Sequence, residues 1–110
     1  MITIEFDNVV NQRCEKIVKI LTSKAKEYAS DTDRLHNFKV AARTLNCTPE
    51  RALLGMMMKH QVSVMDLIDN IDKGLIPSEP MIEEKLGDFC NYIILLEALF
   101  KERLQNIQKV

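Results

Sequence analysis

The chain has 110 residues, 46% hydrophobic and 28% charged, a composition that fits one soluble globular domain with a modest core. Fifteen basic and sixteen acidic residues leave a net charge of -1. No overall field therefore attracts nucleic acid or an anionic membrane surface, and we expect no direct DNA binding. The longest apolar runs are far too short to span a bilayer, so we expect no membrane partner either.

Three cysteines, Cys14, Cys47 and Cys90, bear on the compartment in which the protein functions. They are odd in number, widely spaced and set among apolar neighbours, which favours buried reduced thiols over a disulfide framework or a C-x-x-C metal site. We therefore expect a cytoplasmic protein.

The N-terminal third of the sequence predicts an extended arm followed by a helix. Residues 1–6 alternate apolar and other side chains, which predicts a short strand or arm that Asp7 or Asn8 would follow as a helix cap. From residue 9 to about residue 29, apolar side chains recur at steps of three and four. These are Val10, Cys14, Ile17, Leu21, Ala25 and Tyr28. This spacing places one apolar stripe on a first helix.

Two further helices follow in the middle of the chain. The spacing of Leu35, Phe38 and Ala42 predicts a helix over residues 34–45. The run Thr48-Pro49-Glu50 supplies a cap, a proline at the first helical position and an acid in the first turn, so a third helix is predicted to begin at Pro49. Gly74 tolerates a positive φ and is expected to end it.

The last predicted helix is the longest, and Ser78 is its expected cap. Its apolar stripe runs almost to the C-terminus through Ile82, Leu86, Phe89, Ile93, Leu96, Phe100, Leu104 and Ile107. At 1.5 Å per residue the helix would be about 40 Å long, so its last turns extend past the third helix and need cover. We expect a homo-oligomer that associates through this C-terminal helix. The predicted fold is all-α, a four-helix bundle-like single domain over residues 1–110 with a short extended N-terminal arm.

Polar residues follow one flank of the apolar stripe on each of the last two helices. They are Lys59, Ser63 and Asp66 on the third helix and Glu84, Asp88 and Asn91 on the fourth. Each set repeats at steps of four and three, so its members share a face. A partly desolvated carboxylate requires a partner, which predicts that Lys59 pairs with Asp88 or Glu84. His60 falls on an apolar line and is expected to be a satisfied core histidine rather than a ligand.

A dense polar cluster, D-T-D-R-L-H-N at residues 31–37, stands where the second helix begins. Asp33 is a good helix cap, and Asn37 fits a solvated face, which is the simpler interpretation. Arg34 together with the free N–H groups of the helix start could instead hold an anion. Both interpretations stay open at this point.

Four motifs, K-E-Y (26–28), D-R-L-H-N-F (33–38), L-L-G-M-M-M-K-H (53–60) and E-K-L-G-D-F-C-N-Y (84–92), resemble a group of small bacteriophage proteins. That group is similar to the nucleotide modification associated domain and, more distantly, to the all-α nucleoside triphosphate pyrophosphatases of the MazG type. The resemblance implies an often oligomeric helical domain that handles a nucleotide or modified nucleotide in the host cytoplasm. The family-like polar positions are Tyr28, Asp33, Arg34, Asn37, Lys59, Asp88, Asn91 and Tyr92.

Three functions of different class are compatible with these residues. The first is a nucleotide-binding module in which Arg34 and Lys59 meet phosphate, Asp88 and Asn91 orient a base or ribose, and an aromatic ring stacks. The second is a metal-dependent nucleoside triphosphate pyrophosphohydrolase. The third is a non-catalytic inhibitory or structural protein-interaction module.

The carboxylate spacing departs from the pattern of the pyrophosphatases. Those enzymes hold Mg²⁺ with an E-x-x-E and an E-x-x-D pair, whereas Glu84 and Asp88 give only E-x-x-x-D. A hydrolase using Asp33, Glu84 and Asp88 would need carboxylates from a neighbouring subunit. No cofactor is therefore assigned, and Mg²⁺ belongs to the hydrolase alternative alone.

Overall fold

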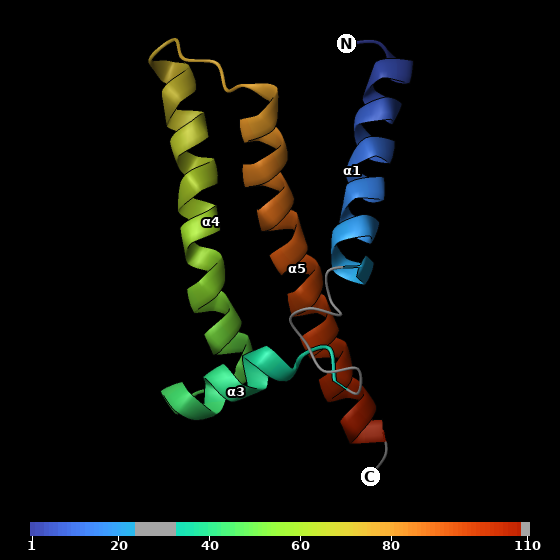
Figure 1. Cartoon of the computed structure of the whole chain (residues 1–110), viewed down its shortest axis with the longest axis vertical. Coiled ribbons are helices and arrows are strands. Elements are labelled where there is room, and N and C mark those ends of the chain that lie inside the picture. Colours follow the sequence, from blue (N-terminus) through green and yellow to red (C-terminus); the bar gives the residue numbers. More distant parts are fainter. Residues whose placement is uncertain (24–32, 109–110) are drawn as a thin grey trace.

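The computed structural model describes residues 1–23 and 33–108, and within these ranges it contains four α-helices. They are α1 (Thr3–Ser23), α3 (His36–Leu45), α4 (Pro49–Asp72) and α5 (Glu79–Gln108). α4 and α5 run antiparallel side by side, α1 lies along α5, and the short α3 crosses the N-terminal end of α4 (Figure 1). The described residues form no β-strand, so the predicted all-α class is confirmed.

The ends of the later helices follow the local chemistry of the sequence. The Thr48 hydroxyl accepts the N–H of Arg51 at 3.1 Å and caps α4, and the Ser78 hydroxyl accepts the N–H of Met81 at 3.3 Å and caps α5. Gly74 has a φ of +80° just beyond α4. These three predictions are confirmed, whereas α3 begins at His36, two residues later than expected.

The predicted N-terminal strand or arm is wrong, because α1 already begins at Thr3. The Glu5 carboxylate accepts the backbone N–H of Ile2 at 3.1 Å, and the N–H of Phe6 bonds the carbonyl of Ile2 at 3.1 Å. Ile2 and Phe6 are four residues apart, so a six-residue alternation fits a helix as well as a strand. The proposed caps Asp7 and Asn8 lie inside α1, and its expected continuation to residue 29 falls outside the described residues.

The hydrophobic core lies at one end of the molecule, where α3 meets α4 and α5. It is formed by Leu35, Phe38, Leu53, Met57 and Leu99. Among these side chains only Leu53 is fully buried. Met56, Phe89, Tyr92 and Leu96 are partly buried against this cluster. The tightest packing is therefore away from the N-terminal part of α1, which lies beside the first half of α5 (Figure 1).

The molecule is more open than a compact domain of its size. Its radius of gyration is 16.6 Å, against about 13 Å expected for a compact chain of this length. Large apolar side chains remain exposed on α1, α4 and α5. Cys14 is also exposed, and Cys47 and Cys90 are half-buried free thiols, so the expectation of three buried cysteines is wrong.

None of the described helices has a stretch that is both long and apolar enough to cross a membrane.

Candidate functional site

Polar and aromatic side chains gather midway along the contact between α4 and α5. The His60 ring from α4 stacks on the Tyr92 ring from α5, with centroids 4.9 Å apart and planes inclined by 29°. Nδ1 of His60 lies 3.7 Å from Oδ2 of Asp88, one turn before Tyr92 on α5. We call His60, Asp88, Asn91 and Tyr92 the polar cluster.

Asn91 is the buried member of the polar cluster and the one whose hydrogen bonding is incomplete. Its residue is 7% exposed, and its Oδ1 atom has no hydrogen-bond partner among the described residues. An amide oxygen buried without a donor costs about 1–3 kcal/mol. The fold therefore retains a buried acceptor beside the carboxylate of Asp88, and a donor placed there would recover that cost.

α1 contributes a cation to the edge of this region. Nη1 of Arg13 donates a long hydrogen bond of 3.5 Å to the carbonyl of Glu83, and the Lys16 ammonium forms an ion pair with the Glu83 carboxylate. Gly87 makes room for the guanidinium, because a Cβ at this position would lie 2.7 Å from Nη1 of Arg13. Gly87 and Asn91 are one turn apart on the same face of α5, so Arg13 rests beside the polar cluster.

Sequence reasoning missed Arg13 because it reads as one of several dispersed cations on the first helix. The available signal was Gly87, a glycine inside a long helix, which often marks the close approach of another group.

The two glycines that lie within helices give a matched test of this contact. A Cβ at Gly55 meets nothing within 4 Å, so Gly55→Ala is expected to raise the free energy of unfolding by about 0.5–1 kcal/mol. Gly87→Ala should gain less or lose stability, because the new methyl displaces Arg13. In an Arg13→Ala background, Gly55→Ala and Gly87→Ala should raise the free energy of unfolding by the same amount. If denaturant unfolding shows equal increases in the wild-type background, the contact between Arg13 and Gly87 is contradicted.

Tyr92 has an altered titration that reports on the polar cluster. Burial raises the pKa of Tyr92 above its ordinary value of 10.0, and the negative charge of Asp88 raises it further. Both effects have the same sign because each disfavours the tyrosinate anion.

This shift can be measured by the ultraviolet absorbance of tyrosinate. The chain has two tyrosines, so Tyr28→Phe leaves Tyr92 as the only one. We expect its midpoint above pH 10.0 in the folded protein and a partial return toward that value in Asp88→Asn, since burial is the larger cause. The protein unfolded in denaturant is the control and should titrate near pH 10. A folded midpoint at or below 10.0 would show that Tyr92 is solvated.

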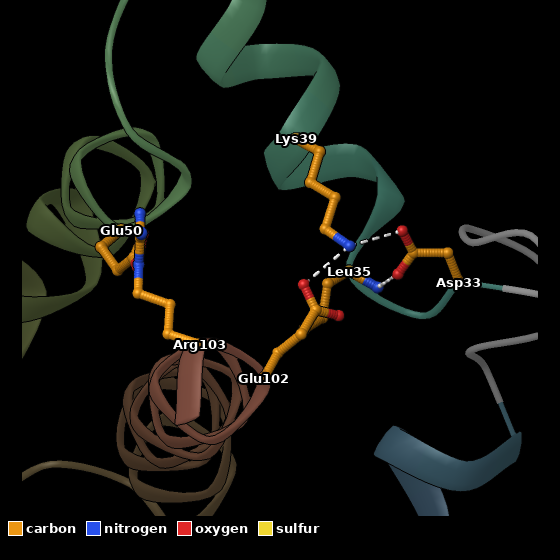
Figure 2. Close-up of polar contacts among 6 residues, drawn as sticks. All are labelled: Asp33, Leu35, Lys39, Glu50, Glu102 and Arg103. Atoms are coloured by element: carbon orange, nitrogen blue, oxygen red, sulfur yellow. Dashed lines mark hydrogen bonds and ion pairs between the residues drawn. The ribbon is translucent and has the colours of Figure 1, made fainter. Parts of the chain in front are cut away.

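The residues predicted from the opening cluster lie elsewhere. The Asp33 carboxylate accepts the Leu35 N–H at 2.9 Å and binds the Lys39 ammonium at 2.8 Å, and Lys39 also binds Glu102 of α5 at 2.8 Å (Figure 2). Glu102 is fourteen residues beyond Asp88, about 21 Å along the helix axis. Asp33 therefore belongs to the α3 end of the molecule, and the pocket expected from Arg34, Asn37, Lys59 and Asp88 stays a prediction.

The contacts at the α3 end are structural in character. Lys39 lowers the pKa of Asp33, with a smaller contribution from the Leu35 N–H, while Asp33 and then Glu102 raise the pKa of Lys39. Arg34 donates from Nη2 to the carbonyl of Leu21 at 2.6 Å and so joins α3 to the last turn of α1. On α5, Arg103 binds the Glu50 carboxylate near the start of α4 (Figure 2). These bonds fix helix positions.

Lys59 and Tyr28 are the remaining residues predicted for the site. The expected pair of Lys59 with Asp88 or Glu84 is wrong for the described residues, because the side chain that faces Asp88 is the His60 ring and the exposed Lys59 side chain has no ion pair. Lys59 and His60 are adjacent and point about 100° apart around α4, so the flank predicted from spacing is not the one that faces Asp88. Tyr28 lies outside the described residues.

A hollow of about 570 Å³ lies where α3 leads into α4. It is lined by Lys39, Ala42, Arg43, Asn46, Cys47 and Pro49. Lys39 is already bound by two carboxylates, which reduces the positive charge it could offer an anion. Sequence reasoning did not single out this hollow, and its lining contains no buried polar atom that lacks a partner.

Metal-ligand geometry is absent from the parts of the chain that the structure describes. No group of three or more His, Cys, Asp or Glu side chains there is arranged to hold an ion.

The fold defines a small all-α protein whose described residues pack as four helices. Comparison with protein-family models, with curated proteins and with solved structures gave no match. The resemblance to small phage proteins therefore rests on the four short motifs alone.

Proposed function

We propose that the polar cluster binds a nucleotide-like small molecule. The observation that carries the proposal is Asn91, whose buried Oδ1 atom has no donor among the described residues. The amino and imino groups of a nucleobase are donors of the required kind, and Asp88 offers a second acceptor three residues away. Such a ligand would recover the cost of leaving Asn91 unpaired.

The neighbouring groups suit the other parts of a nucleotide. The stacked rings of His60 and Tyr92 provide an aromatic surface beside the two acceptors. Arg13 brings a delocalised positive charge, and a guanidinium binds phosphate oxygens in a bidentate manner. In this proposal the phosphate contact belongs to Arg13, because Arg34 is bound to the Leu21 carbonyl at the α1–α3 junction. A phage-encoded protein acting in a host cytoplasm, as the motifs imply, is part of this proposal.

The hydrolase alternative receives less support from the geometry. Its three carboxylates were Asp33, Glu84 and Asp88, but Asp33 is held by Lys39, which also binds Glu102, and Glu102 lies about 21 Å along α5 from Asp88. The interaction-module alternative is favoured by a specific observation, the large exposed apolar surface of α4 and α5. That function concerns a different face of the molecule and is compatible with ligand binding at the polar cluster.

Calorimetric titration with purine and pyrimidine nucleoside mono- and triphosphates tests the proposal. We expect at least one to bind, with Asn91→Leu and Arg13→Ala each weakening affinity at least about tenfold, which corresponds to about 1.4 kcal/mol. Arg51→Ala is the matched control, since Arg51 is an exposed cation elsewhere on α4. Absence of binding by the wild-type protein would overturn the proposal. Binding lost in Arg34→Ala but kept in Asn91→Leu would move the site to the α1–α3 junction.

A further inference from the structure

One face of the α4–α5 hairpin is apolar and uncovered. It consists of Leu54, Met65 and Ile68 on α4 and Leu86, Ile93 and Phe100 on α5, which we call the open face. These side chains are between 36% and 61% exposed. Beyond it, Leu104 and Ile107 continue the same line on α5 with 57% and 71% exposure.

Helix geometry places the open face away from the helices that cover α5. Leu86, Ile93 and Phe100 repeat every seven residues, so they form one continuous line along α5. At about 100° per residue, the Ile93 side chain points about 160° away from that of Asn91, a member of the polar cluster. α1 reaches α5 through Glu83 and Gly87, and α3 reaches it through Glu102, so neither contact falls on this line.

The accessible surface of the chain measures how much cover is missing. It amounts to 8339 Å², whereas a compact monomer of 12.7 kDa exposes about 6,200 Å². The excess of about 2,100 Å² falls within the roughly 1,000–2,500 Å² that each subunit buries in an obligate homodimer. This excess belongs to the whole chain, and the apolar stripe of the open face, four helical turns long, contributes part of it.

We propose that a second copy of this chain covers the open face. The open face itself carries no charge, so it offers nothing that would select an oppositely charged partner of another kind. A line of side chains with a seven-residue repeat is self-complementary, because the same knobs and holes recur on an identical helix. Two hairpins packed face to face about a two-fold axis form a four-helix bundle, with each polar cluster outside the shared interface.

Light scattering coupled to gel filtration at tens of micromolar protein tests this proposal. We expect a mass of twice 12.7 kDa for the wild-type chain and a monomer for Ile93→Asp. Because Ile93 is 47% exposed within one chain, the aspartate should leave the helical circular dichroism unchanged. Phe100→Asp provides a second, independent variant in case one substitution disturbs folding.

Val18→Asp is the matched control, since Val18 of α1 is 59% exposed and lies outside the open face. It should remain dimeric, and so should Asn91→Leu, which separates this proposal from ligand binding. A wild-type monomer at these concentrations would overturn the proposal. The proposal would also be overturned if Ile93→Asp and Phe100→Asp both remained dimeric and dissociated on dilution no more readily than the wild type. The interface would then lie elsewhere.

Discussion

Leu53→Ala is expected to lower the free energy of unfolding by about 2–5 kcal/mol, the range for truncating a fully enclosed leucine. Leu53 is 0% exposed and stands at the centre of the core formed with Leu35, Phe38, Met57 and Leu99. Removing its branched end leaves a cavity that three helices line. The side chains around it are themselves buried and packed, so they can close the cavity only in part.

Denaturant unfolding followed by circular dichroism measures this change. Leu45→Ala is the matched control, because Leu45 ends α3 with 64% exposure and should alter the stability by no more than about 0.5 kcal/mol. A loss below about 1 kcal/mol in Leu53→Ala would mean that the core at the α3 end does not carry the stability of the fold.

Asn91→Leu is expected to act in the opposite direction and to raise the stability of the ligand-free protein by about 1–3 kcal/mol. Leucine has nearly the same shape as asparagine and replaces an acceptor that has no partner by apolar atoms. The same substitution should abolish ligand binding at the polar cluster. A gain in stability with a loss of binding is the result expected of a residue kept for function.

Thermal and denaturant unfolding without ligand measure the effect, with Asn106→Leu as the control. Asn106 is an exposed residue of the same helix and should change stability within about 0.5 kcal/mol. If Asn91→Leu destabilises the protein, the Asn91 amide forms hydrogen bonds that support the fold, and its role is structural.

Local chemistry explains which parts of this fold were predictable from sequence. Thr48 and Ser78 cap their helices and Gly74 adopts a positive φ because each acts on its own few residues of backbone. Residues 1–6 gave the wrong prediction because so short an apolar pattern does not distinguish a strand from one edge of a helix.

The candidate site was only partly predictable, because it depends on how helices are rotated against one another. The flank of α5 that carries Asp88 and Asn91 follows from spacing alone. Whether Lys59 or His60 meets Asp88 depends on a rotation of α4 that the sequence does not encode locally. The binding of Asp33 to Lys39, which also binds Glu102, likewise follows from the position at which α3 crosses the hairpin, which is a tertiary property.

The uneven distribution of packing also determines which part of the molecule opens first. α1 is joined to α5 by Arg13 and Lys16 at one end, while the most tightly packed residues lie at the other. Amide hydrogens of α1 should therefore exchange with solvent by a sub-global opening that leaves the α4 amides around Leu53 protected. In that partly open form the face of α5 that carries Gly87 and Asn91 becomes accessible while the hairpin stays folded. Exposure of the buried Asn91 amide then requires the undocking of one helix, at a lower free energy than global unfolding.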